Sequence, residues 1–157
     1  MSRTCGGRPT SGLSAAAATV VVERPDSESF GTNTIGERFA AAIASKDVAA
    51  LTGLLVENVD FRAMTPGRLW EAHSASDVAN AILGHWFAPS DHIEAIEPVD
   101  TDGFADCQKV SYRFRVTNPA GTFTVEQHAY FTVIAERIVW LRMMCSGYRS
   151  APPRRRV

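Results

Sequence analysis

The side chains best suited to catalysis in this sequence are its histidines, cysteines and tyrosines. The four histidines are scattered, and neither an HExxH pattern nor a paired-cysteine motif occurs, so the sequence predicts no metal site. It also lacks a glycine-rich phosphate loop and a Gly-x-Ser-x-Gly nucleophile elbow. We therefore expect neither a metal nor a cofactor.

His85 and Tyr112 are the two candidate catalytic residues. His85 follows a helical apolar pattern, and a histidine side chain can exchange protons near neutral pH. A structural role for His85 at a core or rim position stays open. Tyr112 could supply a hydroxyl to a ligand, or it could be a core tyrosine. Gln127 lies among apolar neighbours, where a buried amide needs partners. It either bonds Tyr112 or Trp86, or orients a ligand carbonyl.

Two weaker candidates involve a cysteine and a Glu-His pair. Cys145 would need a nearby base or cation to act as a thiolate nucleophile. In a regular strand Arg142 points to the opposite face, so an inert core cysteine is the expected outcome. Glu71 and His73 share a face of a short hairpin and could form a dyad, although they could equally lie on the surface.

Hydrophobic periodicity predicts the elements that position these side chains. Thr34 and Glu37 form a capping box, and helical spacing follows to about Ser45. Asp47 caps a second helix with the apolar stripe Val48, Leu51, Leu54 and Leu55, and a third begins at Ser74 and ends near residues 88–90. Alternation predicts strands over residues 59–64, 69–73, 92–100, 109–117, 122–134 and 138–145. Helices segregated on one face of an antiparallel sheet define an α+β domain.

The order of these elements resembles the nuclear transport factor 2-like superfamily, and its SnoaL-like branch in particular, over residues 34–149. The segments SKDVAALTGLLVENVDFR, VEQHAYFTV and RIVWLRMM carry the resemblance. It implies a cone in which three N-terminal helices pack on a strongly bent antiparallel sheet, with a ligand pocket at the open end. It also implies an inward, ligand-binding set of residues: Phe39, Phe61, Ala63, Trp86, Phe114, Gln127, Ala129, Met143 and Cys145.

This fold hosts isomerases, cyclases, epoxide hydrolases and binding proteins, so the resemblance does not name a reaction. Ketosteroid isomerases of the superfamily use an aspartate base, a tyrosine and a protonated aspartate. Those positions fall at or near Ala63, Phe39 and Ala129. A shift of the late-strand position by one residue would place it at His128 instead. Ketosteroid-type isomerisation is therefore not expected. No inward Asp-Arg-Asp set for epoxide hydrolysis and no inward acid for cyclisation is evident either.

The opposite face of the long strands combines aromatic, methionine and arginine side chains, which is typical of interfaces. Because members of this superfamily often dimerise through this face, the resemblance favours a two-fold contact. An ordinary amphipathic outer face is the alternative. The residues that we predict at a homodimer interface are Arg113, Arg115, His128, Tyr130, Trp140 and Arg142.

Composition bounds the remaining possibilities. The 157 residues, 45% apolar and 21% charged, suit one soluble domain without a membrane partner. The net charge of −1 argues against a nucleic-acid partner, and residues 34–150 alone carry ten basic and fourteen acidic side chains. Three widely spaced cysteines favour the cytoplasm. The composition of residues 1–33 predicts a disordered extension, and that of residues 150–157 predicts a basic tail.

We therefore expect a SnoaL-like protein that binds a small, largely apolar molecule in the cone. Any catalysis would be proton transfer, cyclisation or hydrolysis. The alternative is a non-catalytic, dimeric interaction module with a filled cone. A pocket of about 300 Å³ or more with converging polar groups would favour the first function. An interior packed with Phe39, Trp86 and Phe114 would favour the second.

Overall fold

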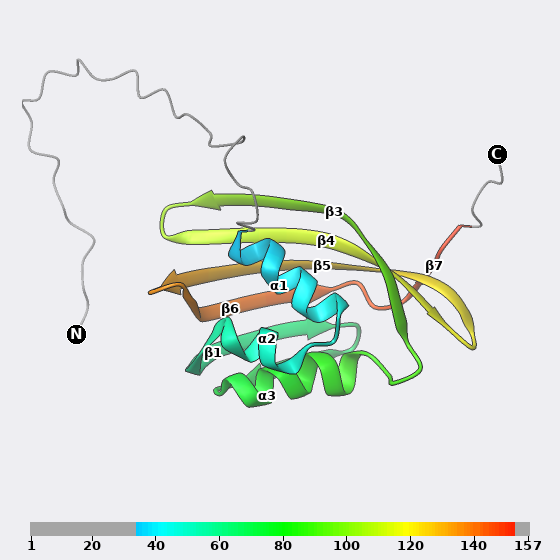
Figure 1. The fold of residues 1–157 in the computed structure, drawn as a ribbon, viewed down its shortest axis with the longest axis horizontal. Helices are drawn as coiled ribbons and strands as arrows, with labels where there is room; N and C mark the ends of the chain where they lie inside the picture. Colours follow the sequence, from blue (N-terminus) through cyan, green and yellow to red (C-terminus); the bar gives the residue numbers. More distant parts are fainter. Residues whose placement is uncertain (1–33, 153–157) are drawn as a thin grey trace, which may run out of the picture. The chain divides into compact units, whose positions relative to one another are not determined.

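The computed structural model describes residues 34–152 and places three helical segments on one face of a curved sheet (Figure 1). The predicted disordered extension, 1–33, and residues 153–157 of the predicted basic tail lie outside the described residues. The helices are α1 (Ile35–Ala44), α2 (Val48–Gly53) and α3 (Ala75–Ala79), which continues into the π-helix η1 (Asn80–Trp86). The strands are β1 (Leu55–Thr65), β2 (Arg68–Ala72), β3 (His92–Phe104), β4 (Cys107–Asn118), β5 (Gly121–Ile134), β6 (Arg137–Cys145) and β7 (Arg149–Ser150).

Side-chain caps begin the helices at the predicted residues. The hydroxyl of Thr34 accepts a hydrogen bond from the Glu37 N–H at 3.1 Å. Asp47 and Ser74 accept the equivalent bonds of α2 and α3 at 3.0 and 3.1 Å. Each cap satisfies a backbone donor that has no partner inside the helix, which fixes where the helix starts.

The sheet has the order β2-β1-β6-β5-β4-β3, with β7 added to β5. Its neighbouring strands are antiparallel except β1 and β6, which are parallel, so the sheet is mixed rather than wholly antiparallel as predicted. The chain passes through β2, α3, η1, β3, β4 and β5 between these two strands. A connection that long can return the chain in either direction, and alternation within a strand carries no information on its direction.

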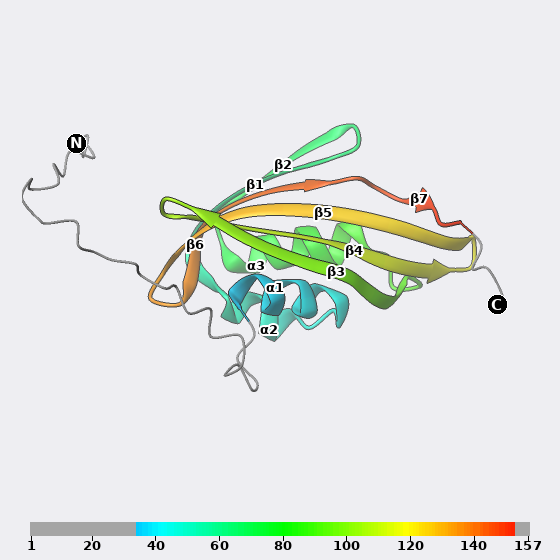
Figure 2. The same ribbon diagram turned by 90° about the horizontal axis from the view of Figure 1, so that it is seen from above.

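The core lies between the helices and the concave face of the sheet (Figure 2). One departure from prediction is Val48, which is 54% exposed. Helix α2 has only six residues and buries Leu51, whereas Leu54 and Leu55 are buried from positions beyond its end. No helix within residues 34–152 is both long and apolar enough to cross a membrane. The α+β class, the three helices and the strongly bent sheet are confirmed.

Candidate functional site

The predicted inward residues meet on the concave face of the sheet. Gln127 of β5 lies opposite Tyr112 of β4 and Cys145 of β6 in the strand register. Met143 lies between Ala129 and Ala63 in the same way. Eight of the nine predicted ligand-binding residues are buried and Trp86 is half-buried, so the centre of the cone is occupied by side chains of the protein itself. This is the filled interior that we expected of the interaction module, and any ligand site has to be sought at the rim of the cone. The eight buried residues are Phe39, Phe61, Ala63, Phe114, Gln127, Ala129, Met143 and Cys145.

Two consecutive hydrogen bonds through Gln127 cross this packed interior. The hydroxyl of Tyr112 donates to Gln127 Oε1 at 2.7 Å, and Gln127 Nε2 donates to Cys145 Sγ at 3.6 Å. Burial raises the pKa of the Tyr112 phenol well above its usual range. Of the roles predicted for Gln127, the structure shows the bond to Tyr112. Because the single phenol proton is directed at Gln127, Tyr112 has none to donate to a ligand in this arrangement.

An aromatic cluster surrounds Trp86 at the end of η1. Trp86, the last residue of η1, lies between Phe61 and Trp70, with ring centroids 6.3 and 6.1 Å away. The ring of Trp70 also lies 5.6 Å from that of His85, tilted by 43°. The indole N–H of Trp86 is buried and has no hydrogen-bond partner within residues 34–152. Trp86 therefore contacts the buried Phe61 on one side and the half-buried Trp70 on the other.

A hollow of about 510 Å³ opens beside Trp86, and we call it the mouth hollow. Three separate segments build it: the end of η1 with the loop that follows, the β4–β5 hairpin, and the segment before β7. The hollow contains His85 and Trp86 together with polar side chains that were not predicted as site residues, among them Asp91 and Tyr148. The residues that line the mouth hollow are His85, Trp86, Ala88, Ser90, Asp91, Asn118, Pro119, Ala120 and Tyr148.

Asp91 is the hub of the mouth hollow. Its Oδ2 accepts the Tyr148 O–H at 2.5 Å and the Ala88 N–H at 2.7 Å, and its Oδ1 accepts the Asn118 amide at 2.8 Å. Lys46 Nζ donates to the Asp91 backbone carbonyl at 2.6 Å. Asp91 is buried, and four residues, Lys46, Ala88, Asn118 and Tyr148, donate hydrogen bonds to it.

The ionisation of this hub follows from its partners. Burial raises the pKa of Asp91, but the hydrogen bonds from Tyr148, Asn118 and Ala88 and the charge of Lys46 outweigh it, so the pKa is lowered overall. Burial raises the pKa of Tyr148, and its bond to the Asp91 carboxylate and the charge of that carboxylate raise it further. At neutral pH the pair is therefore an aspartate and a neutral phenol. Asp91 and Tyr148 hold each other, which leaves His85 as the unpaired titratable side chain among those that line the mouth hollow.

Comparisons with known proteins bear on the fold. No protein-family model matches the sequence, and a search of curated proteins finds no match. Among solved structures, the "Putative Isomerase from Bacillus subtilis" aligns with a TM-score of 0.58 at 14% identity, over 73% of this chain and 90% of that chain. An "NTF-2 like protein of unknown function" from Burkholderia xenovorans LB400 aligns with a TM-score of 0.54 at 13% identity, over 75% and 84%. An "LEH-like epoxide hydrolase" from M. tuberculosis aligns with a TM-score of 0.52 at 14% identity, over 71% and 80%.

The chain has the nuclear transport factor 2-like fold. At such low identity the similarity supports a shared fold but not a shared activity, so the activity has to be inferred from the site. The positions that we predicted to correspond to the ketosteroid isomerase residues hold the buried side chains of Phe39, Ala63 and Ala129. His128, the alternative late-strand position, lies on the outer face beside Glu126. It cannot serve as the inward acid.

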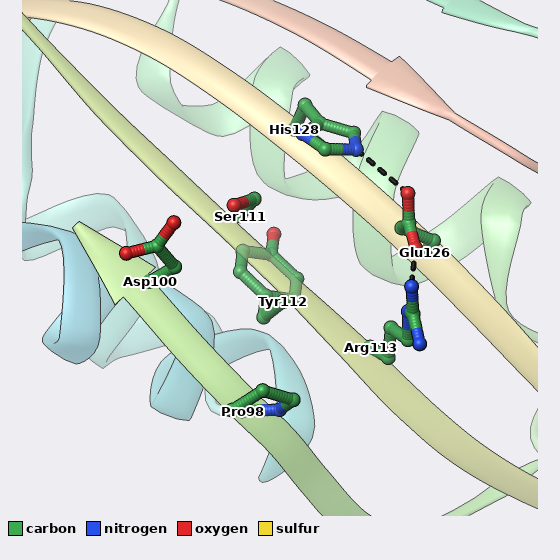
Figure 3. A pocket seen from close by; sticks show the side chains of 7 residues that line it. All are labelled: Pro98, Asp100, Ser111, Tyr112, Arg113, Glu126 and His128. Atoms are coloured by element: carbon green, nitrogen blue, oxygen red, sulfur yellow. Dashed lines mark hydrogen bonds and ion pairs between the residues drawn. The ribbon is translucent and has the colours of Figure 1, made fainter. Parts of the chain in front are cut away.

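The outer face of the domain carries the predicted interface residues. Two of them, Arg113 and His128, line a second, smaller hollow of about 220 Å³ (Figure 3). Arg113 Nε donates to Glu126 Oε2 at 2.5 Å, and His128 Nε2 lies 2.8 Å from Glu126 Oε1 (Figure 3). The hydrogen bonds of Glu126 to His128 and then to Arg113 hold the pKa of Glu126 below its usual range. These charged groups satisfy one another, so we do not select this hollow as the site.

The other predicted interface residues share the same face. Arg142 pairs with Asp60 at 3.2 Å and stacks over the Trp140 ring at 4.4 Å. Tyr130 is 39% exposed, and Arg115 lies 3.6 Å from Glu94. The face therefore combines aromatic surface with neutralised arginines.

The two weaker candidates are also placed by the structure. Glu71 and His73 do pair, at 3.2 Å, but both are exposed and neither lines the mouth hollow. Cys145 is buried, and Arg142 points to the opposite face of β6, as predicted. Within residues 34–152, no three or more His, Cys, Asp or Glu side chains group in a way that could hold a metal ion.

Proposed function

We propose that this nuclear transport factor 2-like domain is a SnoaL-like protein that binds a small, largely apolar molecule in the mouth hollow. The observation that carries the proposal is the convergence there of polar groups from three segments on apolar walls. The volume, about 510 Å³, exceeds the lower bound of about 300 Å³ typical of ligand sites. Two proteins with a similar fold are named as a "Putative Isomerase" and an "LEH-like epoxide hydrolase", and a ligand site on this fold agrees with those names.

The lining suggests how such a ligand would lie. Trp86 and Pro119 offer apolar surface, while Ser90 and Asn118 offer hydrogen-bonding groups beside them. Asp91 and Tyr148 are hydrogen-bonded to each other and form part of the wall of the mouth hollow. A ligand with an apolar ring system and one hydroxyl or carbonyl fits this division. If the protein is an enzyme, His85 is the group that would exchange a proton with that polar end.

We expect 1-naphthol, geraniol or progesterone to raise the melting temperature of the full-length chain in a thermal-shift screen. A ligand at 100 times its Kd stabilises a protein by about 2.7 kcal/mol, which is a shift of several degrees for a domain of this size. Ala120→Trp places a large ring in the mouth hollow from an exposed hairpin position and should abolish the shift. Ala49→Trp, at an exposed position of α2, is the matched control and should keep it. A shift that survives Ala120→Trp would place the ligand elsewhere.

A second proposal concerns the outer face, which we infer to be a homodimer interface. Its support is the exposed apolar surface of Tyr130, which is 39% exposed, beside the half-buried Trp140. We expect Trp140→Glu to weaken the dimer at least tenfold in analytical ultracentrifugation, since it places a charge at the centre of the contact. Arg137→Glu, at the exposed start of β6, should leave the dimer intact. A wild-type chain that sediments as a monomer would contradict the inference.

A further inference from the structure

A third hollow lies where the sheet divides, and we call it the fork hollow. Strands β1 and β6 pair up to Met64 and Met144, after which β1 turns back into β2 and the chain beyond β6 runs to β7 on β5. Figure 2 shows the β1–β2 hairpin diverging from the segment that leads to β7. The space between them has a volume of about 590 Å³. At the base, Gly147 packs so closely that a Cβ there would lie 2.7 Å from Pro66 Cγ, and its φ of +69° also favours glycine.

An apolar row lines one side of the fork hollow. Met64 lies opposite Leu69 in one neighbouring strand and opposite Met144 in the other, so the three side chains share one face of the sheet. They are 46%, 74% and 55% exposed. Single exposed apolar side chains are ordinary, but a continuous row of them marks a surface that binds something.

Two arginines complete the lining. Arg68 lies 3.6 Å over the Trp70 ring, on the face of β2 opposite to Leu69, and it borders the hollow from the hairpin side. Arg149 is exposed and borders the hollow from the β7 side. Within residues 34–152, neither arginine lies within ion-pair distance of a carboxylate. Four other arginines do form such pairs: Arg62, Arg113, Arg115 and Arg142. What distinguishes Arg68 and Arg149 from the other arginines without such a partner, Arg38 and Arg137, is that both line one hollow together with an apolar row.

We propose that the fork hollow binds a medium-chain fatty acid. Its acyl chain would lie on Met64, Leu69 and Met144, and its carboxylate between Arg68 and Arg149. A guanidinium binds a carboxylate through two parallel hydrogen bonds, and methionine side chains adapt readily to a flexible chain. The volume lies within the range of about 300–1,000 Å³ that small-molecule sites occupy. The fork hollow and the mouth hollow share no lining residue, so either proposal can fail without the other.

Isothermal titration calorimetry of the full-length chain with decanoate, below its micelle concentration, tests this site. Arg68→Gln with Arg149→Gln should weaken decanoate binding about 25-fold, at roughly fivefold for each exposed ion pair lost. Arg38→Gln with Arg137→Gln removes two exposed arginines elsewhere and should change the affinity less than twofold. The uncharged 1-decanol should bind the wild type and both double variants equally. Leu69→Ser, at a side chain that is 74% exposed, should weaken binding of both ligands without unfolding the chain.

Three results would overturn the proposal. The first is the absence of decanoate binding. The second is equal decanoate affinity in the wild type and the Arg68→Gln, Arg149→Gln variant. The third is binding to phosphatidylglycerol vesicles without binding to free decanoate, since the hollow would then be part of a membrane-surface contact.

Discussion

Asp91→Ala is expected to lower the free energy of unfolding by about 2–3 kcal/mol. The substitution leaves Tyr148, Asn118 and the Ala88 N–H without the acceptor that they share in the folded state. Hydrogen bonds to a charged acceptor contribute about 1.5–3 kcal/mol. The sum stays near the upper end for one such bond because water can reach Ala88 and Tyr148, which are exposed, once the carboxylate is gone. Urea unfolding measures the change, and Asp106→Ala, at an exposed residue of the β3–β4 turn, should stay within about 0.5 kcal/mol of the wild type. Equal midpoints for the two variants would contradict the role of Asp91 as a hub.

The same carboxylate predicts a dependence on pH. The pKa of Asp91 is lowered in the folded chain from an ordinary value of 3.8. A lowered folded-state pKa gives stability that is present above the unfolded pKa and is lost as the pH falls through the folded value. The wild type should therefore lose stability below about pH 4, and Asp91→Asn should lose less over the same interval. Asp60 and Glu126, whose pKa values are also lowered, act in both proteins and cancel in the comparison. Identical pH profiles would contradict the assignment.

Phe114→Ala is expected to cost about 3–5 kcal/mol of unfolding free energy, the range for truncating a buried phenylalanine. Phe114 is fully buried, and its ring lies 4.7 Å from that of Tyr112 and 6.0 Å from that of Phe87. Urea unfolding again gives the value. Ile134→Ala, at a residue that is 63% exposed, is the control and should change little. A loss below about 1 kcal/mol would show that the cone is not packed around Phe114.

The cavity left by Phe114→Ala gives a further test of the filled cone. An apolar cavity made by truncating a core side chain can bind benzene. Benzene should therefore raise the melting temperature of Phe114→Ala and leave the wild type unchanged. An equal rise in the wild type would mean that its interior already holds an apolar vacancy, and the ligand site would then belong inside the cone.

Much of the fold could be predicted from local patterns. Capping residues such as Thr34 and Asp47 fix helix starts through bonds to residues three positions away. Alternation in β4 and β5 assigns Tyr112 and Gln127 to the same inward face because successive side chains in a strand point to opposite sides. Strand β3 was predicted too short, as residues 92–100 rather than His92–Phe104, because bulges shift its register and break the alternation.

The mouth hollow could be predicted only in part. His85 and Trp86 were selected because they end an amphipathic helix. Asp91 and Tyr148 were missed because they are 57 positions apart and meet only through the tertiary fold. The local signal at Asp91 was its place in a turn, where its carboxylate accepts the Ala88 N–H. Such a turn does not reveal that Asn118 and Tyr148 share the same carboxylate.

A magnetic resonance titration of the isotope-labelled full-length chain with 1-naphthol tests ligand binding in the mouth hollow most directly. We predict saturable shifts of the backbone amides at residues 85–91, 118–121 and 148. These shifts should disappear in Ala120→Trp and persist in Ala49→Trp. Shifts centred on Gln127 and Ala129 would place the ligand inside the cone, and no saturable shift at residues 85–91 would contradict binding in the mouth hollow.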